Sequence, residues 1–272
     1  MNWKTILYWL LPSKTKIIIG KNATGALKHI KDDRDYVSSV DSSFILPQSF
    51  SLRNNSNLTA VENQGGYNSC VTQAITTAIE TYSLNKEWKH PFELSRMYLW
   101  HYGRKLSGTF PENKGMYIRD GWKVAQGDDG VTIEKLYPYS TNFFNVEPGL
   151  AARAFRKWHP PFAYYWIFGT AEQLENGIKN ALFYNKVPIV FAAPLAKSFF
   201  NPTITAVYKP IDNEKLEFRH AMLITGWDDT ANCFEIMNSW GTHWGNSGFL
   251  RVDKNWLLNK ADSFSYPGDI ND

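Results

Sequence analysis

Apolar residues recur at spacings of three and four from Ser69 onward, and this period predicts a helix. The stripe that they form consists of Val71, Ala74, Ile75, Ala78, Ile79 and Tyr82. A repeat of 3.6 residues places such positions on one face. Ser69 precedes the stripe and is a residue type that favours the N-cap position. The pattern therefore predicts a helix with Cys70 in its first turn.

The remainder of the chain divides into a helix-rich part followed by a strand-rich part. Turn signals such as Trp227-Asp228-Asp229 separate short apolar or alternating runs in the second part, and this is typical of strands. The predicted helices lie around 93–103, 119–126 and 171–183, and the predicted strands at 187–193, 219–227, 233–238 and 248–253. Helices first and strands later predict an α+β protein with a helical lobe and a sheet lobe.

Composition narrows the class of protein. Of the 272 residues, 43% are hydrophobic and 20% are charged, which is ordinary for a globular chain. The net charge of +3 comes without a dense run of Lys and Arg, so no nucleic-acid partner is expected. No segment approaches the length of a membrane span. We also expect no metal and no cofactor.

Residues 1–45 differ from the rest of the chain. Basic residues alternate there with short apolar patches and the acidic cluster Asp32-Asp33-Asp35. We interpret them as an N-terminal extension, an arm or short pro-like segment able to contact the cleft, with 46–272 as the main domain. A poorly ordered terminus is the alternative. The apolar run near the start is only six residues long, too short for a convincing signal peptide.

Cys70, His220 and Asn238 supply a thiol, an imidazole and an amide able to orient the imidazole, and these are the parts of a cysteine nucleophile site. Only a thiolate attacks, and both a helix N-terminus and a nearby imidazolium lower a thiol pKa. His220 opens an apolar run, so we expect it at the mouth of a cleft. Asn238 is then placed to orient the imidazole, and Trp240 to cover their hydrogen bond from water. The second cysteine, Cys233, is expected to be a buried and inert thiol.

Gln64 completes this set. Its NH₂ group and the backbone N–H of Cys70 are both able to point at the oxyanion of a tetrahedral intermediate. Gly65 and Gly66 allow the chain to bend tightly between the two donors.

These motifs resemble those of the papain-like cysteine peptidases, the C1 family, over roughly 46–256. The matching blocks are Leu46-Pro47 through Leu52-Arg53, Val61-Glu62-Asn63-Gln64-Gly65, Gly115-Met116-Tyr117, Tyr137-Pro138-Tyr139 and Asn238-Ser239-Trp240-Gly241. The resemblance implies an endopeptidase with Cys70 and His220 as the catalytic pair, Asn238 orienting His220, and Gln64 in the oxyanion hole. It also implies a two-lobe fold, with a helical left lobe, a β-barrel-like right lobe and the active-site cleft between them.

The sequence departs from the family pattern at several positions. Tyr67 stands where the family has a disulfide-forming cysteine. This loss fits a divergent microbial or viral-type member and favours a cytoplasmic or intracellular setting over secretion. At the substrate-binding edge only Gly115 remains of two family glycines, so the bulkier Met116 and Tyr117 are expected to narrow the cleft. Arg219 either favours acidic groups in the substrate or is a solvent-exposed charge.

Two other functions fit the same sequence. A papain-fold binding or structural protein would keep the fold with its cleft closed by residues 1–45 or narrowed by Tyr117. An acyltransferase would use the same thioester and pass the acyl group to an amine instead of water. The expected partner of the enzyme is a peptide or protein substrate.

Overall fold

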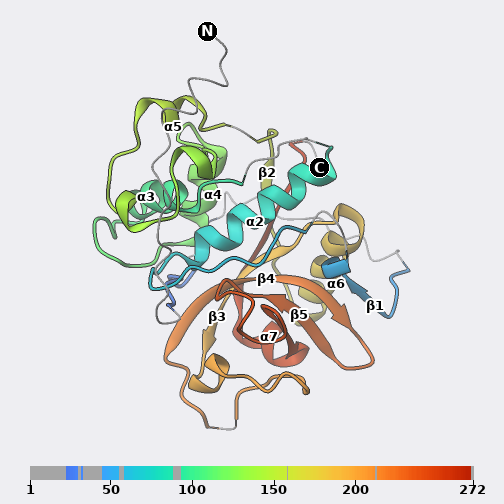
Figure 1. The fold of residues 1–272 in the computed structure, drawn as a ribbon. Coiled ribbons are helices and arrows are strands. Elements are labelled where there is room, and N and C mark those ends of the chain that lie inside the picture. Colours follow the sequence, from blue (N-terminus) through green and yellow to red (C-terminus); the bar gives the residue numbers. More distant parts are fainter. Residues whose placement is uncertain are drawn as a thin grey trace.

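The computed structural model describes residues 23–29, 32, 45–54, 58–87, 93–157, 159–211 and 213–270. A long central helix, α2 (Cys70–Asn85), lies between a group of helices and an antiparallel sheet (Figure 1). Most of the predicted N-terminal extension, residues 1–22, 30–31 and 33–44, lies outside the described residues.

The helical lobe consists of α3 (Arg96–Leu106), α4 (Ile118–Gln126) and the short α5 (Leu150–Ala154). The helix α3 begins at Arg96, where the Ser95 side chain accepts the Tyr98 N–H as an N-cap, which satisfies one of the free amides of the first turn. The predicted 93–103 helix is thus shifted by three residues at both ends.

The other lobe is built on one sheet with the strand order β2-β7-β3-β4-β5-β6, and β1 adds to one end of β4. Its strands are β1 (Ser49–Ser51), β2 (Ala163–Trp166), β3 (Ile189–Leu195), β4 (Phe218–Asp228), β5 (Cys233–Met237), β6 (Phe249–Asp253) and β7 (Asp262–Gly268). The helices α6 (Ala171–Asn180) and α7 (Lys254–Lys260) accompany it. The α+β class is confirmed, whereas the barrel-like lobe is corrected: the described strands form an open sheet, with β2 and β6 at its two ends.

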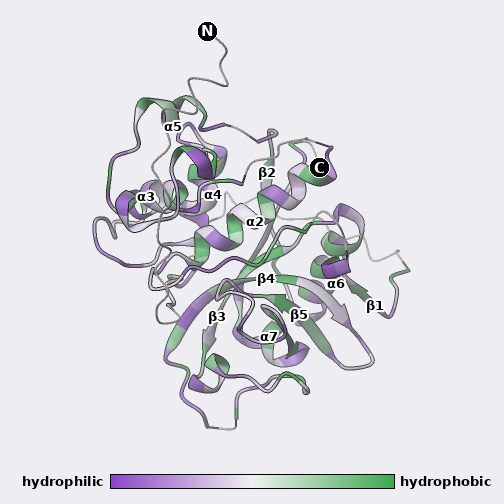
Figure 2. Cartoon of the chain, viewed as in Figure 1, coloured by the Kyte–Doolittle hydropathy of each residue, from purple (hydrophilic) through white to green (hydrophobic). Residues whose placement is uncertain are grey.

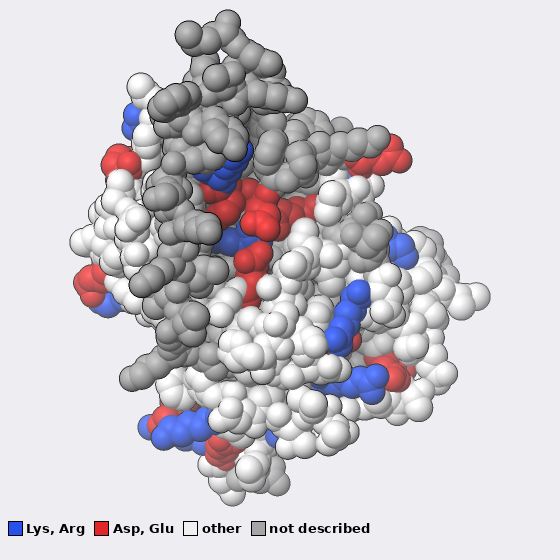
Figure 3. Space-filling view, in the orientation of Figure 1, with Lys and Arg blue, Asp and Glu red and all other residues white. Residues whose placement is uncertain are grey.

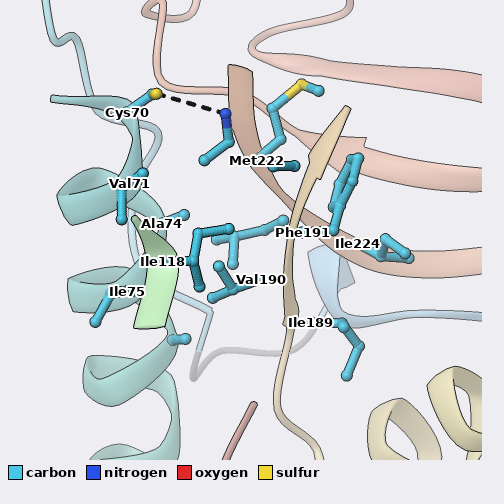
Figure 4. Packing of buried hydrophobic residues seen from close by; sticks show 14 of the residues in the cluster. Cys70, Val71, Ala74, Ile75, Ile118, Ile189, Val190, Phe191, Met222 and Ile224 are labelled. Carbon is cyan, nitrogen blue, oxygen red and sulfur yellow. Dashed lines mark hydrogen bonds between the residues drawn. The ribbon is translucent and has the colours of Figure 1, made fainter. Parts of the chain in front are cut away.

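The stripe predicted on α2 packs against both the sheet and α4. Ala74 lies on the side of α2 that faces β3 and β4 in Figure 4, whereas Val71 and Ile75 approach Gly121 of α4, and all three side chains are buried. Burying a side chain such as Ile contributes roughly 1.5–3 kcal/mol. Most residues of α2 outside the stripe are buried as well. In the hydropathy colouring, green apolar stretches alternate with purple and pale ones along α2 and the strands of the sheet (Figure 2).

A buried ion-pair cluster joins α2 to α3 and to the chain before α2. Arg96 lies 2.9 Å from Glu62 and 3.1 Å from Glu80, and its side chain is only 2% exposed. In the space-filling view, acidic and basic side chains gather near the middle of the molecule (Figure 3). Two carboxylates that face one buried guanidinium leave each charge paired. In the part of the chain that is described, no helix is long and apolar enough to cross a membrane.

Candidate active site

Cys70 is the first residue of α2, and its thiol is completely buried. The sulfur accepts the backbone N–H of Ala221 on β4 at 3.4 Å, which is the dashed line in Figure 4. The helix start thus directs Sγ at the strand that carries His220. This contact brings together parts of the chain that are 151 residues apart.

His220 and Asn238 meet through the β4–β5 hairpin. Leu223 pairs with Met237, and this register carries Asn238, the next residue, toward His220. Asn238 Oδ1 lies 2.8 Å from Nε2 of the ring and also accepts the Ser239 N–H at 2.7 Å. Since Oδ1 of Asn238 accepts the Ser239 N–H, this atom is an oxygen and can only accept. Nε2 of His220 must therefore carry the proton in the bond between His220 and Asn238. The other ring nitrogen, Nδ1, is left as a proton acceptor, with no hydrogen-bond partner among the described residues.

An aromatic layer covers this imidazole. The ring of Trp240 stacks on His220 with centroids 4.6 Å apart. Phe200 in turn stacks on Trp240, with centroids 5.0 Å apart. Trp240 is 1% exposed. The exclusion of water strengthens the bond between His220 and Asn238.

The side-chain amide of Gln64 is held in one orientation. The hydroxyl of Ser239 donates to Oε1 of Gln64 at 2.7 Å, and Nε2 donates to the carbonyl of Tyr67 at 2.8 Å. Because the Tyr67 carbonyl can only accept, the NH₂ group must lie on its side, so the amide oxygen faces Ser239 and the NH₂ group faces the cleft. Gly65 turns the chain beside it with a φ of +57°, a conformation that suits glycine.

Residues 23–29, called the arm below, lie across these groups beside the N-terminal end of α2 (Figure 1). The carbonyl of Ala23 accepts from Nε2 of Gln64 at 3.1 Å and from Nε1 of Trp240 at 3.0 Å. Gly25 and Met116 are joined by a backbone hydrogen bond of 3.0 Å. Further along, the amides of Ala26 and Leu27 donate to the carbonyls of Arg219 and Met116 at 3.3 and 3.1 Å. The expected contact between the N-terminal extension and the cleft is therefore present in the structure.

Burial sets the protonation of Cys70 and His220. It raises the pKa of the Cys70 thiol to about 11, although the N–H groups of Ala221 and Gly25 favour the thiolate. Burial likewise lowers the pKa of His220 to about 4, against the opposing effect of the Asn238 hydrogen bond. In this covered form both groups are neutral at pH 7. The sequence-based expectation of a lowered thiol pKa is therefore wrong for this form, because desolvation outweighs the helix N-terminus.

The structure gives the surroundings of three residues that were predicted at the substrate edge. The methyl group of Met116 fills the space that Gly103 and Gly121 leave between α3 and α4, so its side chain does not narrow the cleft. Tyr117 is the N-cap residue of α4 and is half-buried. Arg219 forms an ion pair with Asp262, so its charge is already partnered.

Two features of the site were missed from the sequence. Ser239 was not predicted to fix Gln64, although it stands between Asn238 and Trp240 in the sequence. The contact point of the arm was also missed, and its signal is the run of small residues Ala23-Thr24-Gly25-Ala26. A Cβ on Gly115 would lie 1.2 Å from the carbonyl oxygen of Gly25. The close passage of the arm thus requires glycine at 115.

Metal ligation is not built into the described residues, where no group of three or more His, Cys, Asp or Glu side chains is placed to hold an ion. The two cysteines, Cys70 and Cys233, are both free thiols and both buried. The chemistry that the site offers is therefore that of a thiol, an oriented imidazole and an oriented amide.

Comparison with known proteins agrees with this arrangement. An uncharacterized peptidase C1-like protein, L477, of Acanthamoeba polyphaga mimivirus is 27% identical over 205 residues, which are 72% of this chain and 65% of that protein. Viral cathepsin of Adoxophyes honmai nucleopolyhedrovirus is 25% identical and covers 77% of this chain and 58% of its own length. The chain thus spans less than two thirds of the length of these relatives.

Solved structures show the same fold. Xylellain, a cysteine protease from Xylella fastidiosa, superposes with a TM-score of 0.82 at 25% identity, covering 95% of this chain and all of that one. A digestive procathepsin L2 proteinase from Tenebrio molitor superposes with a TM-score of 0.70 at 20% identity, covering 92% and 83%. The model of the papain family cysteine proteases matches residues 46–266. This chain, with its free thiol at the start of a central helix, belongs to the papain family of cysteine proteases.

Proposed function

We propose that the protein is a cysteine endopeptidase in which Cys70 is the nucleophile and His220 the acid and base. The observation that carries this proposal is the convergence of three parts: the thiol at the start of α2, the imidazole with its free Nδ1, and the Gln64 amide turned toward the cleft. A nucleophile, a base and an oxyanion donor are the minimum set for acyl transfer through a thioester.

The reaction proceeds in two halves. His220 Nδ1 takes the thiol proton, and Sγ of Cys70 attacks the carbonyl carbon of the peptide bond. Gln64 Nε2 and the Cys70 N–H donate to the oxyanion that forms. The C–N bond then breaks, the Nδ1 proton goes to the leaving amine, and a thioester remains. In the second half Nδ1 takes a proton from water, the hydroxide displaces the sulfur, and the free carboxylate leaves.

Asn238 acts through His220 by fixing which ring nitrogen carries the permanent proton. The opposite tautomer would leave Nδ1 protonated and unable to accept the proton of the thiol. Trp240 shields this bond from water, which keeps the ring in the productive orientation.

We further propose that the arm inhibits the enzyme in the form described by the structure. Its Ala23 carbonyl occupies the Gln64 donor that the substrate oxyanion needs. The Gly25 N–H, not a carbonyl carbon, faces the Cys70 sulfur, so the arm offers no electrophile for attack. Two solved structures with the same fold, a proCathepsin B and a procathepsin L2, are proforms by name.

Hydrolysis of a fluorogenic peptide library tests the proposed activity, using the full chain and a full chain with Gly25→Val, which displaces the arm. Cleavage by the Gly25→Val chain is expected to vanish when Cys70→Ala or His220→Ala is added. Turnover that persists in either double variant would contradict the assigned roles. Product analysis with an added primary amine distinguishes hydrolysis, which yields the carboxylate, from transfer, which yields the amide.

A further inference from the structure

We propose that the hydroxyl group of Tyr139 is a positioning group for the oxyanion hole, and this inference rests on the proposed peptidase function. Tyr139 lies outside the catalytic set. Its single phenolic oxygen nevertheless contacts the two backbone segments that supply the two oxyanion donors.

The contacts are short and specific. The hydroxyl of Tyr139 donates to the carbonyl of Gln64 at 2.9 Å. It also lies 2.5 Å from Oγ of Ser69, the residue immediately before Cys70. One oxygen therefore links the residue that carries the side-chain donor to the residue that precedes the backbone donor.

The proton count fixes the direction of both bonds. A phenol has one proton, and the Gln64 carbonyl can only accept, so this proton goes to Gln64. The hydroxyl of Ser69 must then donate to the Tyr139 oxygen. Ser69 Oγ in turn accepts from Nε2 of Gln73 at 3.4 Å. Each of the two hydroxyls in this chain of bonds thus acts as both donor and acceptor.

Tyr139 itself is held from two sides. Its backbone N–H donates to the carboxylate of Glu134, and its ring packs edge-on against Tyr67 with centroids 5.8 Å apart. Tyr67 is the same residue whose carbonyl accepts from the Gln64 side chain. The phenol is therefore a fixed point to which the donor loop is tied.

Loss of the hydroxyl alone would loosen the loop. The Gln64 carbonyl would keep the Tyr67 N–H at 3.3 Å as its partner, and the Ser69 hydroxyl would lose its acceptor. Oxyanion donors act by being in place before charge develops, and small displacements of such groups cost rate steeply. The effect belongs in the chemical step, because the phenol does not touch the thiol or the imidazole.

Two reactions of Cys70 separate this role from general damage to the site. Peptide hydrolysis passes through an oxyanion, whereas alkylation by iodoacetamide is a displacement at a saturated carbon and needs no oxyanion hole. Both rates are measured on the full chain with Gly25→Val, alone and combined with Tyr139→Phe. Tyr137→Phe is the matched control, since the hydroxyl of Tyr137 also bonds backbone carbonyls, those of Phe143 at 2.9 Å and of Val146, away from the site.

The expected result is a fall in kcat of about 5- to 50-fold for Tyr139→Phe, with KM and the alkylation rate within about twofold of the parent. Tyr137→Phe should match the parent in both reactions. Added to Gln64→Ala, Tyr139→Phe should cause a smaller loss than it does alone, because one of the two donors that it positions is already gone.

Parent-like hydrolysis by Tyr139→Phe would overturn the inference. Equal losses in hydrolysis and alkylation, or an additive loss with Gln64→Ala, would overturn it as well by showing a merely structural role. A parent that alkylates at Cys70 but hydrolyses no peptide would instead overturn the proposed function, and this inference with it.

Discussion

Substitution of Gly25 by valine should displace the arm from the cleft. A Cβ at position 25 would lie 2.5 Å from the carbonyl oxygen and 2.6 Å from the Cβ of Asn68. Asn68 cannot easily retreat, because Asn113 accepts both its backbone and its side-chain N–H at 2.9 and 2.6 Å. The added side chain therefore has to move the arm and not the wall of the cleft.

The size of the expected effect follows from the protonation of Cys70. A thiol with a pKa of about 11 is ionised to roughly one part in ten thousand at pH 7, since each pH unit below the pKa is a factor of ten. Exposure to water returns the thiol toward its ordinary pKa of 9.0, which increases the thiolate about 100-fold. Pairing with His220 would increase it further.

The assay is the second-order rate of iodoacetamide alkylation at pH 7, located by peptide mass spectrometry. Cys233 lies elsewhere in the fold and serves as the internal standard. Gly149→Val is the control substitution, because a Cβ at Gly149 meets nothing within 4 Å. We expect Cys70 to react at least about 100-fold faster in Gly25→Val than in the unaltered chain, with Gly149→Val unchanged. Equal rates in all three chains would refute the reasoning.

Three further predictions follow from the same contacts. Asn238→Ala should lower the kcat of the arm-displaced enzyme by about 10- to 100-fold while leaving measurable activity, and an unchanged kcat would remove its orienting role. Arg96→Ala should lower the free energy of unfolding by about 3–5 kcal/mol, because it strands buried carboxylates; chemical denaturation measures this, with the exposed Arg251→Ala as control, and similar losses in both would contradict the burial argument. Burial keeps His220 neutral with a pKa of about 4, so protonation favours any state in which the ring is hydrated. Stability of the covered form should therefore be lost progressively as pH falls from about 6.5 toward 4. Hydrogen exchange at the Leu27 amide, corrected for its intrinsic rate, measures this as a falling protection factor, and constant protection over that range would contradict it.

The helix α2 was predictable because its signal is local. The apolar stripe and Ser69 before it lie within one segment, and the helix indeed begins at Cys70. The strands β2 and β7 were missed. The first is only four residues long, and the second, Asp262–Gly268, contains a proline and several polar residues that tertiary pairing alone makes extended. Strand preference depends strongly on such context.

The site shows the same division between local and tertiary information. The sequence identified Cys70, His220, Asn238 and Gln64, and the structure brings the four together around one cleft. The direction of the Met116 side chain could not be predicted, because it depends on the space that glycines on two different helices leave. Nor could the neutral state of the thiol, which results from its burial in the folded chain, where the arm contacts residues 41 and 217 positions away in the sequence.

The most direct test of the account is to trap the acyl-enzyme. The full chain with Gly25→Val is mixed with an activated peptide ester, quenched in acid within seconds and digested for mass spectrometry. The account predicts an acyl group on Cys70 that disappears as the free acid is released, and no adduct when Cys70→Ala is added. An unmodified Cys70, or acylation of Cys233 instead, would contradict it.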